Sequence, residues 1–82
     1  MGSLFVRTDN ENDGSEAIES KNDLTFNGGV VEAYAYDDGL NASNSITVNG
    51  GCLYIQSIEN DAFDSNGDLY FNGGVTVAIG GV

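Results

Sequence analysis

A three-residue motif, Asn-Gly-Gly, recurs at a nearly constant interval along this chain of 82 residues. It begins at Asn27 and returns 22 and then 23 residues later, at Asn49 and Asn72. Repeats with a period of about 20 to 50 residues are typical of solenoids, in which each repeat forms one coil that stacks on the next. The sequence therefore predicts a β-solenoid of about three and a half coils, each of 22–23 residues.

The hydrophobic residues fall into columns when the three motifs are superposed. Alternating segments precede the motifs, and they read Leu24-Thr25-Phe26, Ile46-Thr47-Val48 and Leu69-Tyr70-Phe71. Alternation with a period of two indicates short strands with one buried face. A second alternating segment follows each motif, and Asp, Asn and Gly fill the corners between segments. We therefore expect an all-β parallel β-helix with two strands per coil, no helix, and a further core column of Ile18, Leu40 and Phe63.

The length of the chain indicates one domain. Residues 1–3, Met-Gly-Ser, look like an added or leader segment, so we expect the solenoid domain to cover residues 4–82. Terminal coils of a solenoid need caps or partners, and no clear cap can be recognised in this sequence. We therefore expect a fragment or an assembly unit of a longer solenoid.

The charge of the chain excludes some classes of partner. The chain has thirteen acidic residues and only two basic ones, Arg7 and Lys21, which gives a formal net charge of −11. Such an excess repels phosphate backbones, so we expect no nucleic-acid partner. No apolar run reaches the roughly 18 residues of a membrane span, so we expect no membrane partner. Cys52 is the single cysteine, which leaves no internal disulfide and no cysteine metal site, and we expect a small, half-buried side chain there.

Acidic or amide residues recur in pairs, three positions apart, at the corner before each first strand. The pairs are Glu16 and Glu19, Asp38 and Asn41, and Asp61 and Asp64. Stacked carboxylates about 5 Å apart repel each other by on the order of 1 kcal/mol. Calcium would offset this repulsion, because it takes six to eight oxygen ligands from carboxylates, amides and carbonyls. The alternative is that these residues occupy solvated turns, where Asp and Asn bond to the local backbone.

Two further sets of side chains are candidates for structural or binding roles. The asparagines of the motifs are expected to form a structural ladder, because each amide can bond to its copy on the next coil; they are Asn27, Asn49 and Asn72. The outward positions of the second strands are unusually apolar, which indicates an interaction surface. Tyrosines on this surface suit the faces of sugar rings, with Tyr34, Tyr36 and Tyr54 the strongest candidates and Tyr70 a weaker one. Packing against another protein is the alternative for this surface.

Longer stretches of the sequence resemble the sequence motifs of a known family. They include Tyr36-Asp37-Asp38-Gly39-Leu40-Asn41-Ala42-Ser43, Ser45-Ile46-Thr47-Val48-Asn49-Gly50-Gly51 and Asn60-Asp61-Ala62-Phe63-Asp64-Ser65-Asn66-Gly67. Over roughly residues 14 to 80 the chain resembles the clostridial carbohydrate-binding β-helix family, whose members are similar in fold to pectate lyases. The resemblance implies a right-handed parallel β-helix, a location outside the cell or on its surface, and binding of cellulose or acidic plant polysaccharides. It also implies calcium ligands at Asp38, Asn41, Asp61 and Asp64, whereas Glu16 and Glu19 depart from the family pattern.

The sequence favours binding over catalysis. A lyase mechanism needs a base, yet the chain has no histidine, and the alignment puts neither Arg7 nor Lys21 in the acidic corners. Ice binding needs flat arrays of threonine, and the repeats supply one outward Thr per coil at most. We therefore expect a calcium-stabilised, non-catalytic module that binds plant cell-wall polysaccharide. The alternative is a structural solenoid that forms homo-oligomers or extracellular filaments through its open ends.

Overall fold

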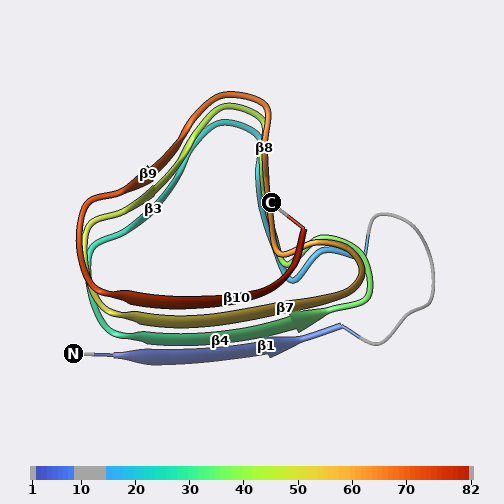
Figure 1. Cartoon of the computed structure of the whole chain (residues 1–82), viewed down its shortest axis with the longest axis horizontal. Helices are drawn as coiled ribbons and strands as arrows, with labels where there is room; N and C mark the ends of the chain where they lie inside the picture. The colour runs from blue at the N-terminus through green and yellow to red at the C-terminus, as the bar shows by residue number, and fades with distance from the viewer. Residues whose placement is uncertain (1, 9–14, 82) are drawn as a thin grey trace.

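The computed structural model is a parallel β-solenoid, and it describes residues 2–8 and 15–81 (Figure 1). These residues form ten strands and no helix, so they contain no helical segment that could cross a membrane. The strands are β1 (Ser3–Arg7), β2 (Ile18–Ser20), β3 (Leu24–Phe26), β4 (Val30–Ala35), β5 (Leu40–Ala42), β6 (Ile46–Val48), β7 (Cys52–Asp61), β8 (Phe63–Ser65), β9 (Leu69–Phe71) and β10 (Val75–Gly81).

Each coil adds one strand to each of three sheets. The sheets have the strand orders β1-β4-β7-β10, β2-β5-β8 and β3-β6-β9, and every pairing is parallel. Figure 1 shows successive coils lying almost on top of one another. Leu24 pairs with Ile46, and Ile46 pairs with Leu69, so equivalent residues of successive repeats form vertical files. The all-β solenoid fold predicted from the repeat is therefore confirmed.

The prediction of two strands per coil was wrong, because each coil has three. Ile18, Leu40 and Phe63 begin the strands of the β2-β5-β8 sheet, in a region that the sequence pattern assigned to a corner. Each of these strands has one large apolar residue followed, two positions later, by a small one, namely Ser20, Ala42 or Ser65. They therefore lack the apolar alternation that indicated the equally short strands β3, β6 and β9. Their stacking on the equivalent strands of neighbouring coils supplies the backbone hydrogen bonds that define them.

The core fills the space between the three sheets. Leu40, Ile46, Ile55 and Phe63 are almost completely buried, and they come from all three sheets. In the last coil, by contrast, Ala78 occupies the inward column but is exposed to solvent. The burial of a column therefore depends on the coil above it as well as on the alternation within the strand.

The second glycine of each Asn-Gly-Gly motif meets a backbone requirement that other residues do not. Gly29, Gly51 and Gly74 have φ angles of 87°, 93° and 83°. A Cβ on Gly51 would also lie 2.6 Å from the carbonyl oxygen of Gly29 on the preceding coil. Left-handed backbone and close contact between coils both select glycine, and this explains why the motif repeats.

The start of the chain takes part in the first sheet. The carbonyl of Gly2 accepts a hydrogen bond from the backbone N–H of Val30 at 3.0 Å, and Ser3 is paired with Val30 in β1. Met1 lies outside the described residues. The structure therefore extends the solenoid to residue 2, ahead of the expected boundary at residue 4.

Candidate functional site

Aromatic side chains contact one another on the outer face of the β1-β4-β7-β10 sheet. The ring centroids of Tyr34 and Tyr54 are 5.7 Å apart, and those of Phe5 and Tyr34 are 5.6 Å apart. The Tyr34 hydroxyl donates to Glu32 Oε2 at 3.2 Å, and burial, followed by this hydrogen bond, raises the pKa of Tyr34. Three strands thus contribute to one aromatic strip whose rings hold one another in place.

An open groove of about 790 Å³ lies beside this strip. Its lining combines aromatic, polar and charged side chains, namely Phe5, Arg7, Thr8, Tyr34, Ala35, Tyr36, Gln56, Ile58 and Glu59. Arg7 lies opposite Tyr34 in the β1–β4 register. The sequence pattern missed Phe5 and Arg7 because β1 precedes the first recognisable repeat, although the apolar residues around them in Ser3–Arg7 were a signal for a strand.

The four candidate sugar-binding tyrosines do not lie on one face. Tyr34, Tyr36 and Tyr54 lie on or beside the β1-β4-β7-β10 sheet, whereas Tyr70 lies in β9 of another sheet. Tyr70 is 47 % exposed, and its hydroxyl donates to Asp68 Oδ2 at 2.9 Å, a bond that raises its pKa. Tyr70 is therefore separate from the groove.

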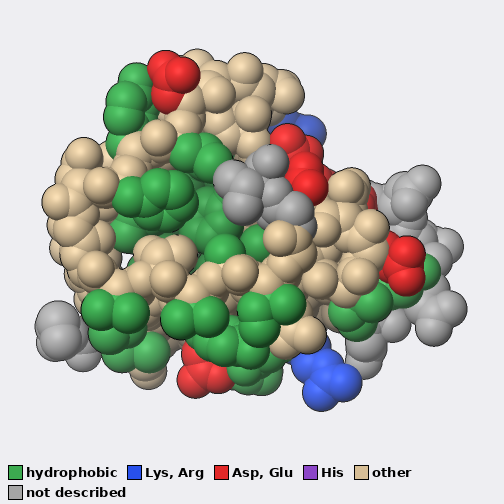
Figure 2. Space-filling model, in the orientation of Figure 1, with side chains coloured by type: hydrophobic (Ala, Val, Ile, Leu, Met, Phe, Trp, Pro, Cys, Tyr) green, Lys and Arg blue, Asp and Glu red, His purple; other side chains and the backbone are tan. Residues whose placement is uncertain are grey.

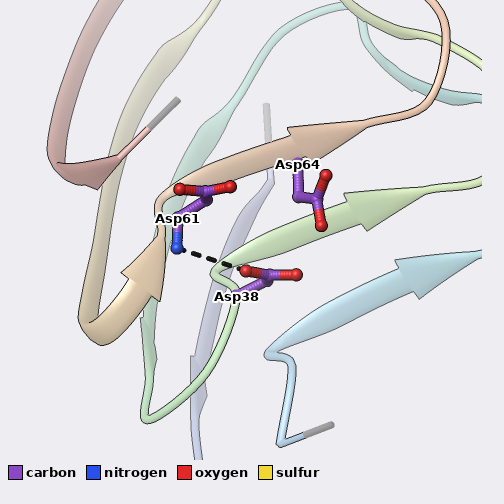
Figure 3. A group of neighbouring side chains, drawn as sticks. All are labelled: Asp38, Asp61 and Asp64. Carbon is purple, nitrogen blue, oxygen red and sulfur yellow. Dashed lines mark hydrogen bonds between the residues drawn. The ribbon is translucent and has the colours of Figure 1, made fainter. Parts of the chain in front are cut away.

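Three of the candidate metal ligands form a compact acidic cluster, which we define as Asp38, Asp61 and Asp64. One carboxylate oxygen of each lies within 4.8 Å of those of the other two. Asp38 precedes β5, Asp61 ends β7 and Asp64 lies in β8, so two successive coils contribute (Figure 3). Asp38 is 3 % exposed and accepts a hydrogen bond from the backbone N–H of Asp61 at 3.2 Å. The fold thus concentrates negative charge at one corner.

The structure itself offsets part of the repulsion within the acidic cluster. Asn41 Nδ2 donates to Asp38 Oδ2 at 2.9 Å and to Asp64 Oδ2 at 3.4 Å. A hydrogen bond with Asp38, followed by burial and the charges of Asp38 and Asp61, raises the pKa of Asp64 to about 6. A raised pKa means that Asp64 resists ionisation beside its neighbours. The cluster therefore favours a proton or a cation.

The first coil extends the line of acids in a different way. Burial, followed by the charges of Glu19, Asp37 and Asp38, raises the pKa of Glu16. Its Oε2 atom is buried and has no hydrogen-bond partner among the residues that the structure describes. Glu19 pairs with Asn41 in the β2–β5 register. Glu16 and Glu19 thus continue the file of acids, but neither joins the three carboxylates of the acidic cluster within the described part of the chain.

Lys21 contacts one of the corner acids, Glu19, although the alignment of the repeats placed no basic residue in the acidic corners. Lys21 Nζ lies 3.6 Å from Glu19 Oε2, and the lysine side chain is 86 % exposed. The alignment of repeats missed this contact, because Lys21 is in a turn and reaches Glu19 through its long side chain. Such exposed pairs contribute little to stability.

The motif asparagines form a file of side-chain hydrogen bonds. Asn49 Nδ2 donates to Asn27 Oδ1 at 2.9 Å, and Asn72 Nδ2 donates to Asn49 Oδ1 at 2.8 Å. Cys52, which was expected to be half-buried, is instead exposed at the start of β7. Its partners in the sheet register, Val30 and Val75, are themselves exposed on the outer face.

Comparison with known proteins gives one finding. A family model described as carbohydrate-binding domain-containing protein matches residues 1–62. This match covers β1 to β7, and with them the aromatic strip and every residue that lines the groove. No curated protein and no solved structure is significantly similar to the chain.

Proposed function

Since this chain belongs to the family of carbohydrate-binding domain-containing proteins, we propose that it binds polysaccharide along the outer face of the β1-β4-β7-β10 sheet. The observation that carries the proposal is the groove bordered by the aromatic strip. Tyr34 and Tyr36 line this groove, and Tyr54 contacts Tyr34 beside it. Flat aromatic faces match the apolar faces of pyranose rings, and the groove is open, so a glycan can reach them.

The polar groups of the groove support plant cell-wall glycans, cellulose or acidic sugars, as the ligands. Gln56 and Glu59 offer amide and carboxylate groups to sugar hydroxyls along the same groove. Arg7 adds a guanidinium, whose fork of N–H donors fits a carboxylate in a bidentate manner. Arg7 therefore favours uronic acids over neutral sugars, whereas the tyrosines can contact the ring faces of either class.

Calcium is proposed at the acidic cluster, because the donor set fits this ion. The three carboxylates supply hard oxygen ligands, and the buried Glu16 Oε2 of the preceding coil, outside the acidic cluster, is a further oxygen without a hydrogen-bond partner among the described residues. Asn41 can present its amide oxygen after rotation of the amide group, since the positions of N and O are interchangeable in shape. Calcium would supply positive charge that lowers the repulsion among these carboxylates.

A non-catalytic role outside the cell accompanies this proposal. The family description refers to binding, the chain has no histidine, and Lys21 is in an ion pair with Glu19. Extracellular calcium-binding modules have dissociation constants of about 10⁻⁴ to 10⁻³ M. Millimolar calcium outside the cell would therefore occupy such a site.

The glycan proposal is tested by affinity electrophoresis and pull-down with cellulose and with polygalacturonate, with calcium and with chelator. We expect Tyr34→Ala and Tyr36→Ala each to weaken retention by about 1–2 kcal/mol, a magnitude typical of aromatic contacts at binding surfaces. Tyr70→Ala is the matched control, since it removes an exposed tyrosine from another sheet. Absence of retention on every glycan, or equal losses for all three variants, would contradict the proposal.

Self-assembly is a second candidate, favoured by the exposed apolar end of the last coil. Hydrophobic side chains gather in the middle of the end that faces the viewer in Figure 2. Phe71 is 54 % exposed and borders a hollow of about 460 Å³ with Thr76 and Ala78. Stacking of a second copy on this end would bury these side chains. Light scattering that finds a monomer at high concentration would remove this candidate.

A further inference from the structure

The groove and the acidic cluster are connected by the same pair of stacked chain segments. At one end, the backbone N–H of Glu59 donates to the carbonyl of Tyr36 at 2.9 Å, and both residues line the groove. At the other end, the backbone N–H of Asp61 donates to Asp38 Oδ1 at 3.2 Å, and both residues belong to the acidic cluster. These two inter-coil contacts lie two residues apart along each segment.

Between these two contacts lies a third, in which Asp37, Ser57 and Asn60 are joined by several hydrogen bonds. Asn60 Nδ2 donates to Asp37 Oδ1 at 2.8 Å, and this bond joins the same two coils. The hydroxyl of Ser57, a residue only 5 % exposed, donates to the carbonyl of Asp37 and accepts from the backbone N–H of Asn60 at 2.9 Å. We call the Asp37–Asn60 pair with Ser57 the middle rung. Asn60 and its bond to Asp37 are exposed, whereas the Ser57 hydroxyl is buried and satisfied both as donor and as acceptor. A buried polar group that is satisfied in this way holds backbone segments in a fixed relation.

We propose that calcium bound at the acidic cluster orders the groove through the middle rung, with Asn60 as the positioning residue. A cation held by Asp38 and Asp61 fixes the contact between their coils. The middle rung then carries this restraint to the Tyr36–Glu59 contact, because it joins the same two segments one residue further along. Asn60 does not line the groove and contributes no carboxylate to the cluster. The inference rests on the proposed function, since it links the calcium site to the glycan groove.

Cooperative binding follows from this arrangement. A groove that calcium has already ordered loses less conformational freedom when a glycan binds, so calcium raises the affinity for glycan. By thermodynamic linkage, the glycan raises the affinity for calcium by the same factor. Couplings between sites commonly amount to about 5- to 150-fold in affinity.

Amide hydrogen exchange at Glu59, followed by NMR with calcium and with chelator, tests the inference without any glycan. We expect calcium to slow this exchange by about 5-fold or more in the unmodified chain, and by less than about 2-fold in Asn60→Ala. Asn44→Ala is the matched control, because Asn44 Nδ2 makes the same kind of inter-coil bond to Asp23 Oδ1, at 2.8 Å, in another corner. Asn60→Asp, which places a carboxylate opposite Asp37, is expected to behave like Asn60→Ala.

The outcomes separate this inference from the function on which it rests. Calorimetry that finds calcium binding without any change in Glu59 exchange would overturn the inference, as would full slowing in both Asn60 variants. A chain that binds no calcium overturns the calcium site and the inference together. Titration with a neutral cello-oligosaccharide, which does not chelate calcium, forms a separate arm. If the oligosaccharide binds neither with calcium nor with chelator, the proposal of neutral-glycan binding is wrong. Slowed hydrogen exchange at Glu59 in the presence of calcium would still support the connection between the calcium site and the groove.

Discussion

At the scale of single residues, the acidic cluster shows how stacked repeats change the chemistry of their side chains. Asp64 is an ordinary aspartate in the sequence, yet its pKa rises to about 6 because the fold sets it beside Asp38 and Asp61. Asn41 supplies N–H donors to two of these carboxylates. An amide between the acids thus reduces the repulsion that a close stack of three carboxylates alone would have.

The raised pKa of Asp64 predicts a pH-dependent stability in the absence of metal. Its pKa is about 6 in the folded chain and 3.8 as the ordinary value, so the folded chain binds more protons between these limits. The free energy of unfolding should therefore fall as pH rises through the range from about 4 to 6. Urea unfolding in chelator at a series of pH values measures this trend. Asp64→Asn should flatten it, and an unchanged slope in that variant would contradict the assignment.

Gly39 illustrates a steric requirement at one residue. A Cβ there would lie 2.7 Å from the carbonyl oxygen of Ala62 and closer still to Cγ2 of Ile55, whereas a Cβ on Gly28 would have no neighbour within 4 Å. We expect Gly39→Ala to lower the free energy of unfolding by about 1–3 kcal/mol through overpacking. Gly28→Ala should leave it within about 0.5 kcal/mol. Equal effects of the two substitutions in chemical unfolding would refute this interpretation.

At the scale of elements, strands of three residues are stable here because each pairs with the equivalent strand of a neighbouring coil. β2, β5 and β8 each span three residues, and they pair in register through the solenoid. An isolated pair of such strands would be marginal in water. The stack supplies hydrogen bonds above and below, and the side chains of each column pack on their equivalents.

The asparagine file gives a prediction about the contacts between elements. Asn49 takes part in two amide hydrogen bonds, as donor to Asn27 and acceptor from Asn72, whereas Asn72 makes one within the file. We therefore expect Asn49→Ala to cost about 1–2 kcal/mol of unfolding free energy and Asn72→Ala about half as much. Thermal and urea unfolding of the two variants measure the ratio. A larger loss for Asn72→Ala would show that the file does not act as a ladder.

At the scale of the whole molecule, the solenoid separates two kinds of surface. The β1-β4-β7-β10 sheet presents the aromatic strip and the groove, while the acidic cluster lies at the corner where β7 ends and β8 begins. The formal net charge of −11 adds a general repulsion to the local one within the cluster. Because the three carboxylates come from two coils, an ion bound at the corner would hold the stack together and reduce this repulsion.

Calcium should therefore stabilise the entire chain against unfolding. With a dissociation constant of about 10⁻⁴ to 10⁻³ M, about 10 mM calcium adds about 1.4–2.7 kcal/mol to the free energy of unfolding. Calorimetric scans with and without calcium measure the shift. Magnesium at equal ionic strength is the control, since it screens charge similarly but fits a flexible carboxylate site poorly. An identical shift with both ions would indicate screening in place of a site.

Much of the architecture could be predicted from the repeat, because the residues that recur are the ones that each coil needs in order to stack on the next. Gly51 recurs where the backbone is left-handed and close to the next coil, and Leu24, Ile46 and Leu69 recur where a column is buried. The acidic positions could be proposed in the same way, since equivalent residues of stacked coils must lie near one another. The third strand of each coil could not be recognised, because β2, β5 and β8 carry one large apolar residue each and lack the apolar alternation of β3, β6 and β9.

The sequence by itself determined that the chain winds into stacked parallel coils, since side-chain size, charge and backbone freedom recur with the period of one coil. The tertiary structure alone decided which of the aligned side chains lie close to one another. Asp38, Asp61 and Asp64 converge while Glu16 stays outside the cluster, and Arg7 joins Tyr34 in a groove although no repeat contains it. The physical reason is that a period fixes the height of a residue in the stack, whereas side-chain contacts across coils and corners depend on directions in space that the period does not encode.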